Sequence, residues 1–278
     1  MSMEETFSVA RRRLGWELMP ILAVLGALSL LAISGPVLVA SQNSPDAPTR
    51  PTVIEPKAQA LLDKTLQALG GASFLGFKSL TTSGRAFTIS DDQTAGFAPF
   101  TSAVVYPDKR HFSYGKKKPV TIINNGDQGW ELDKYGTISQ KPVDLLRWKT
   151  INRYSLENLL RVRIHEPGML IQDGGTDFVD QLPARVLTMV DARQVQIKLF
   201  ISNSNFLPIR ITYRMQNATG DDWDEYADVY GDYQRIQGSQ TPMHITRFLN
   251  DDRESETYRN TAKYDESYPA DYFVIDKK

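Results

Sequence analysis

Apolar and polar residues alternate along the chain from Arg185 to Met215, the pattern of strands that bury one face. The apolar residues of the first such strand share one face: Val195, Ile197, Leu199 and Ile201. The alternation resumes after a polar turn at residues 203–205, which predicts an antiparallel hairpin. An apolar sheet face has to be covered by helices, by a second sheet or by a ligand, so its cover decides the function.

Strand patterns also occupy the stretches before and after this hairpin, separated by Pro107, a lysine-rich turn or an Asn-Gly turn. They cover residues 80–89, 101–106, 110–114, 120–124 and 129–134 in the first half, and 228–236, 243–249 and 256–264 in the second. Lys116 to Lys118 are expected at an exposed hairpin tip.

Helical spacing of apolar residues appears over residues 56–69 and again over 142–164. The first helix has Pro56 in its first turn and Gly70-Gly71 as a stop signal, and a kink could divide the second. The predicted fold class is therefore α+β, in the order helix, long meander, helix, second long meander.

The N-terminal 40 residues read as an export segment. Arg11 to Arg13 precede an uncharged stretch over residues 18–40 with small residues at its end, which is typical of a signal peptide. The stretch exceeds the usual apolar core of ~7 to 15 residues and matches the ~20 that span a bilayer, so an uncleaved membrane anchor stays open. Either alternative predicts that the rest of the chain lies in the periplasm. Proline-rich residues 41–55 are expected to be a flexible linker, and residues 56–278 one domain.

Several short segments, in order, carry a resemblance. They are residues 69–71 (Leu-Gly-Gly), 106–110 (Tyr-Pro-Asp-Lys-Arg), 125–130 (Asn-Gly-Asp-Gln-Gly-Trp), 206–210 (Phe-Leu-Pro-Ile-Arg) and 230–238 (Tyr-Gly-Asp-Tyr-Gln-Arg-Ile-Gln-Gly), the last followed by Thr241-Pro242. Together they resemble the outer-membrane lipoprotein-sorting family, the LolA/LolB-like carriers. The resemblance implies a single antiparallel sheet curved into an incomplete barrel, with helices over its concave side and an apolar cavity that holds acyl chains.

The sequence also departs from this family. Ser41 stands where a lipidated receptor would need Cys, which disfavours a membrane-tethered form of the LolB kind. The inserted helix over 142–164 and the acidic turn at residues 221–225 have no counterpart in the carriers. Direct shuttling of lipoproteins is therefore in doubt, while binding of lipids or hydrophobic peptides stays open.

Composition and motif spacing exclude several classes of function and site. The net charge of −1 gives no support to nucleic-acid binding, and the absence of cysteine excludes disulfides and thiolate sites. His111, His165 and His244 lack the spacing of a metal site, the acidic turn lacks the ligand order of a calcium loop, and Gly174-Gly175 is expected in a polar loop. We therefore expect no metal, no cofactor and no enzymatic activity.

The leading hypothesis is a periplasmic carrier for the acyl chains of lipoproteins or other elongated apolar ligands. Its partner would be a lipid or an acylated protein, with an envelope protein as a further partner and membrane contact only through an uncleaved N-terminus. The alternative is a non-enzymatic interaction or sensor module on the same fold. Candidate cavity residues, each of which could equally fill an ordinary core, are Phe112, Ile122, Trp130, Leu132, Leu146, Ile197, Leu199, Ile209 and Ile211.

Overall fold

A computed structural model describes residues 50–217 and 221–275, all within the unit that begins at Arg50. The predicted export segment and residues 41–49 of the predicted linker lie outside the described residues. The rest of that linker is not a free tether, because Val53–Ile54 form β1 and pair in parallel with Leu170 and Ile171.

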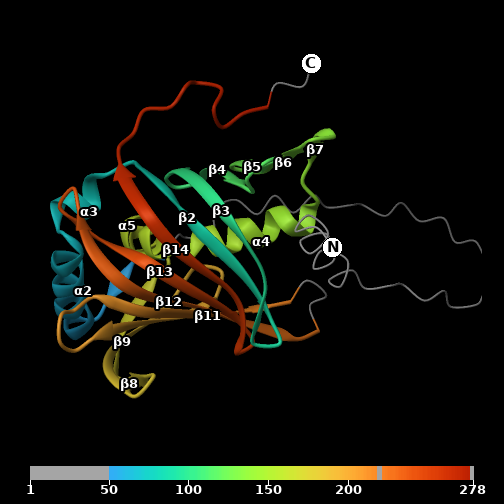
Figure 1. Ribbon diagram of the computed structural model, residues 1–278. Coiled ribbons are helices and arrows are strands. Elements are labelled where there is room, and N and C mark those ends of the chain that lie inside the picture. Colours follow the sequence, from blue (N-terminus) through green and yellow to red (C-terminus); the bar gives the residue numbers. More distant parts are fainter. Residues whose placement is uncertain (1–49, 218–220, 276–278) are drawn as a thin grey trace, which may run out of the picture. The chain divides into compact units, whose positions relative to one another are not determined.

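The described strands form one fourteen-stranded sheet in the order β1-β8-β9-β10-β11-β12-β13-β14-β2-β3-β4-β5-β6-β7 (Figure 1). The strands of the first meander are β2 (Ser79–Ser90), β3 (Gln93–Val105), β4 (Lys109–Tyr114), β5 (Val120–Asn125), β6 (Gln128–Asp133) and β7 (Gly136–Ser139). Those of the second are β8 (Leu170–Val179), β9 (Leu182–Val190), β10 (Gln196–Ser202), β11 (Pro208–Gln216), β12 (Trp223–Ile236), β13 (Ser239–Leu249) and β14 (Asp252–Tyr264).

All neighbouring strands except β1 and β8 run antiparallel, and β14 joins the two meanders by pairing with β2. Since β1 and β7 stand at opposite ends of the order and do not pair, the barrel stays incomplete. The predicted fold class is confirmed.

The helices are α2 (Pro56–Leu69), α3 (Ala72–Gly76), α4 (Pro142–Arg153), α5 (Leu156–Arg161) and a 3₁₀ turn at Arg163–His165. Helix α2 has the predicted bounds. The second predicted helix is divided, because the backbone leaves the helical conformation at Tyr154 and Ser155. None of the helices in the described ranges combines the length and the apolar character needed to cross a membrane.

The main core lies between the helices and one face of the sheet, which we call the helix face. Helices α2 and α5 contribute Leu62 and Leu159 to it, and the sheet contributes side chains of β8 to β13, β2 and β14. A smaller cluster on the opposite, outer face contains Val179, Ala184, Val186 and Phe200. The sheet thus carries its larger apolar cluster on the helix face and a smaller one on the outer face, where Lys198 is exposed as predicted.

The prediction of a polar loop at Gly174-Gly175 is wrong. Both glycines lie within β8, where the register with β9 shifts between Asp173 and Thr176. A Cβ at Gly174 would lie 2.9 Å from the Thr188 Cγ2, so this bulge brings β8 too close to β9 for a larger residue. The acidic segment 221–225 is likewise only partly a turn, since β12 begins at Trp223. Lys116 to Lys118 are exposed between β4 and β5, as expected.

Candidate functional site

At the end of the helix face that α2 and α5 cover, the apolar residues are fully packed. Ile197, Leu199 and Ile211 are 1%, 0% and 0% exposed, and all belong to the main core. Leu199 is paired with Ile211 across β10 and β11 and with Leu187 across β10 and β9. These predicted cavity residues meet on one face, and together with the helices they fill this part of the structure.

Helix α4 contacts the sheet in a different manner. Trp148 is the residue that it buries, whereas α2 buries Ala58, Leu61, Leu62, Thr65 and Leu69. Polar ties hold α4 instead. Arg147 Nη2 donates to both carboxylate oxygens of Glu254 at 2.6 Å, and Asn152 Nδ2 donates to the Pro107 carbonyl at 2.7 Å. Lys149 also forms an ion pair with Asp127. This helix therefore crosses the sheet without a wide apolar interface.

Beneath α4, the register places Arg110, Phe112 and Tyr114 of β4 on the helix face. Arg110 pairs with Val104, which pairs with Leu80 of the main core, and side chains of directly paired residues share a face. The Arg110 guanidinium carbon lies 5.5 Å from the Phe112 ring centroid and 5.6 Å from that of Trp148. The Arg110 guanidinium therefore lies within cation–π distance of two aromatic rings, one from β4 and one from α4.

Arg110 has an amide as its polar partner. Its Nε donates to Asn124 Oδ1 at 3.1 Å, and the Asn124 amide donates in turn to Gln140 Oε1 at 2.6 Å. Among the described residues, no carboxylate forms an ion pair with it. Burial, and next the positive charge of Arg247, lower the pKa of Arg110 to about 9. The guanidinium still carries its charge at neutral pH, without a counter-charge.

Arg247, in contrast, is neutralised by a two-point ion pair. Its Nε and Nη2 donate to Asp228 Oδ1 and Oδ2 at 2.7 and 2.8 Å, and the two residues face each other across β13 and β12. Although burial opposes the charge, this carboxylate raises the pKa of Arg247 above its usual range. Arg247 and Asp228 therefore both remain charged on the helix face of the sheet.

Tyrosines surround the pair. The rings of Tyr213 and Tyr226 stack at 5.1 Å between centroids, and Tyr154 reaches Tyr213 at 4.6 Å. Burial is the first cause that raises the pKa of Tyr213 and of Tyr230, and the negative charge of Asp228 is the second. The Tyr230 hydroxyl is buried and has no hydrogen-bond partner within residues 50–217 and 221–275. The helix face near α4 thus combines charged groups with tyrosines of the main core, whereas α2 itself buries mainly aliphatic side chains.

The remaining predicted cavity residues are distributed over both faces. Phe112 and Ile122 are partly buried, pair with each other and lie on the helix face. Trp130 and Leu132 lie on the outer face, since they pair with Ile123 and Thr121, which flank Ile122 in the strand.

Two further predicted residues lie away from the helix face. A register shift beside Phe200 turns Ile209 to the outer cluster. Leu146 is 58% exposed on α4. The predicted set is therefore not one continuous wall.

Arg110, Trp148, Asp228 and Arg247 are not among the site residues predicted from the sequence. A signal was present, since a charged residue at an inward position of an alternating strand is unusual and needs a reason. Arg110 precedes Phe112 by two residues, and Asp228 precedes Tyr230 in the same way. Residues two apart in a strand share a face, so this spacing places each charge among inward aromatic rings.

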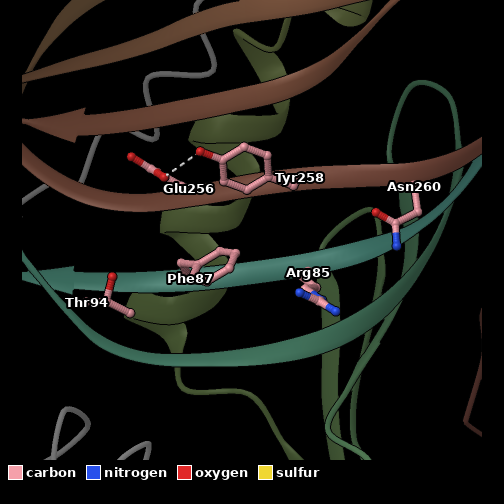
Figure 2. A pocket seen from close by; sticks show the side chains of 6 residues that line it. All are labelled: Arg85, Phe87, Thr94, Glu256, Tyr258 and Asn260. Carbon is pink, nitrogen blue, oxygen red and sulfur yellow. Dashed lines mark hydrogen bonds between the residues drawn. The ribbon is translucent and has the colours of Figure 1, made fainter.

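A depression of about 590 Å³ lies on the outer face and is lined by Arg85, Phe87, Thr94, Glu256, Tyr258 and Asn260 (Figure 2). Figure 2 shows Phe87 of β2 beside Tyr258 of β14, whose hydroxyl donates to Glu256 Oε2 at 3.1 Å. Phe97 stacks on Phe87 with 5.7 Å between ring centroids and is 44% exposed. This aromatic surface does not include the residues beneath α4.

No family model and no curated protein matches the sequence. Solved structures do match. A DUF1329 family protein from Desulfovibrio piger aligns at TM-score 0.52 and 9% identity, over 78% of this chain and 96% of that one. An outer membrane lipoprotein-sorting protein domain from Vibrio parahaemolyticus aligns at TM-score 0.50 and 8% identity, over 77% and 97%. A LolA superfamily protein from Nitrosomonas europaea aligns at TM-score 0.49 and 14% identity, over 78% and 97%.

Identities this low establish the fold alone. The likenesses at TM-scores of 0.50 and 0.52 include a lipoprotein-sorting domain, which is the family that the short sequence segments resemble. In architecture, the chain is therefore similar to the lipoprotein-sorting proteins.

Proposed function

We propose that this protein is a non-enzymatic carrier of the cell envelope, located in the periplasm, which binds the acyl chains of lipids or lipoproteins. The observation that carries the proposal is the contrast between the two ends of the helix face. The α2 end is filled by the main core, whereas α4 buries Trp148 alone, and Phe112 and Ile122 on the helix face of β4 and β5 stay partly buried.

The mechanism would be reversible burial of the ligand under α4. Each methylene that leaves water contributes ~0.8 kcal/mol, so a long chain can be held without specific polar recognition. Because α4 is tied by polar contacts, its displacement by a ligand would expose little apolar surface. The sheet would then act as a rigid wall and α4 as the part that moves.

Native mass spectrometry of the protein purified gently from a Gram-negative host tests this proposal. We expect a copurified mass that organic extraction removes and that behaves as a lipid. A matched pair of variants localises it: Ile122→Trp should reduce uptake of a fluorescent fatty acid, while Lys198→Ala on the outer face should not. A wild type that carries no lipid and binds no fatty acid would refute the proposal.

A second candidate function is protein binding in the envelope. It is favoured by the outer aromatic surface, where Phe97 is 44% and Tyr258 is 39% exposed. Such rings are enriched at binding interfaces. Under this alternative, Phe97→Ser would abolish capture of a partner by the purified protein without changing its lipid content.

A further inference from the structure

Arg110 holds a positive charge that the described residues leave without a counter-charge. Its hydrogen-bond partner is the neutral amide of Asn124, and the charged group that shifts its pKa is another cation, Arg247. Each other guanidinium in this region has a carboxylate, since Arg247 pairs with Asp228 and Arg147 with Glu254. A partly buried charge without a partner costs folding free energy, so its presence on the helix face calls for a reason.

The surroundings of Arg110 suit a ligand that is anionic at one end and apolar elsewhere. Phe112 and Trp148 flank the guanidinium and restrict its position, and Asn124 fixes Nε through one hydrogen bond. Within the described part of the chain, no hydrogen bond uses the terminal nitrogens Nη1 and Nη2, which form the fork that binds carboxylate or phosphate at two points. Next along the helix face are Phe112, Ile122 and Tyr114, so apolar surface begins where the charge ends.

We propose that the Arg110 guanidinium, between Phe112 and Trp148, binds the carboxylate or phosphate end group of an acylated ligand. This inference rests on the proposed carrier function and deepens it, because it assigns the ligand a charge and an orientation. The acyl chain extends from Arg110 over Phe112 and Ile122, beneath α4. Neutral chains of the same length bind more weakly, since they leave the guanidinium without a partner.

Matched ligands test the assignment. Palmitate, lysophosphatidate with a palmitoyl chain, and the neutral hexadecanol share an acyl or alkyl chain of one length and differ at the end group. A charge-assisted hydrogen bond predicts that the wild type binds an anionic ligand ~10 to 100 times more tightly than hexadecanol. Whichever of palmitate and lysophosphatidate binds more tightly identifies the end group as carboxylate or phosphate. Binding of inorganic phosphate alone shows whether the acyl chain is required.

The variants are Arg110→Met, Arg110→Lys and, as control, Arg235→Met at an exposed position of β12. Arg110→Met should lose the preference for the anion and keep the affinity for hexadecanol, Arg110→Lys should retain part of the preference, and Arg235→Met should behave as wild type. Removing an uncompensated charge should leave the melting temperature of Arg110→Met unchanged or higher, whereas a merely structural arginine would lower it.

Two results would overturn the assignment in distinguishable ways. If the wild type binds all chains equally, or if Arg110→Met keeps the preference, the anion site is wrong and the carrier function stands. If the wild type binds none of the chains, the carrier function fails and the anion site fails with it.

Discussion

Arg147 on α4 and Glu254 on β14 form a forked contact in which Nη2 lies 2.6 Å from both carboxylate oxygens. Glu254 is not paired with a residue of β13. Arg247 pairs with Ser255, and the next residue, Phe248, pairs with Arg253, so Glu254 lies in a bulge between them. The bulge frees Glu254 to reach α4. An irregularity in the sheet thus creates the attachment point of the helix that covers it.

We expect Glu254→Gln to loosen α4 with little loss of global stability. The pair is partly exposed, with Arg147 at 40%, and such pairs contribute ~0.2 to 1 kcal/mol. Hydrogen exchange should therefore rise over residues 142–153 while the melting temperature changes little. Glu225→Gln removes a pair with Arg214 that joins two strands, so it should leave α4 unchanged. Equal exchange in both variants would contradict the role of Glu254.

Removing Asp228 should be among the most damaging single changes. Asp228→Asn leaves the partly buried Arg247 without its carboxylate; because breaking a fully buried pair costs ~3 to 5 kcal/mol, we expect a loss near the lower end of that range. Urea unfolding measures the loss. The double change of Asp228→Leu with Arg247→Met removes both charges and should recover most of it. If the double variant is as unstable as the single one, packing rather than charge determines the effect.

The core near α2 is fully packed, so a larger side chain placed in it should destabilise the protein. Leu199 is fully buried between Leu187 and Ile211, so Leu199→Trp should cost ~1 to 3 kcal/mol and lower the melting temperature. Lys198→Ala, one residue away on the outer face, should have no effect. A stable Leu199→Trp protein would show that this end of the helix face accepts extra volume.

Stability should fall at alkaline pH because of the buried tyrosines. Burial raises the pKa of Tyr264 to about 12, and it also raises those of Tyr154, Tyr213, Tyr226 and Tyr230. A phenol that stays neutral in the native state stabilises it below pH ~10, and this contribution is lost as pH rises through the native pKa. Arg110 acts in the opposite direction above about 9, but it is one group against several.

Urea unfolding from pH ~8 to ~12 measures this loss. Tyr264→Phe should be less stable near neutrality by ~1 kcal/mol, because Thr241 loses its hydrogen-bond partner, but it should lose less on going to high pH. An alkaline loss of equal size in this variant and in the wild type would exclude Tyr264 as a contributor.

Gly84 should not tolerate a side chain. A Cβ there would lie 1.9 Å from the Tyr258 carbonyl oxygen of the paired strand β14, next to the bulge at Asn260. We expect Gly84→Ala to destabilise the protein, since backbone atoms have to move. Gly231→Ala is the control, because its nearest neighbours are side-chain atoms of His244 at 3.9 Å. Thermal unfolding of the two variants should differ clearly.

Local patterns predicted the elements that bury one face. Helix α2 has its predicted bounds because apolar spacing, Pro56 and Gly70 all agree. Strand β8 escaped prediction because residues 174–178 are exposed or bulged and show no alternation. Helix α3 was missed because its five residues are too few to show a helical period.

The candidate site was less predictable because it depends on the register between strands and on where α4 crosses the sheet. Trp130 could be assigned to a face only once the register of β5 with β6 was known. Arg110 and Trp148 meet because α4 crosses the strands, which neither local sequence encodes. Ile209 lies on the outer face because the register of β10 with β11 shifts beside Phe200, which the alternation of apolar and polar residues does not reveal.

The position of β14 between β13 and β2 has a consequence for assembly. Among the described strands, β14 is the last in sequence order and it joins the two meanders, so this sheet cannot be completed before residues 252–264 have been synthesised. A chain that crosses a membrane unfolded would gain from this order, because premature closure of the sheet is excluded by its own topology. Truncation before β14 should therefore leave two separate meanders with exposed edges, prone to aggregate rather than to fold.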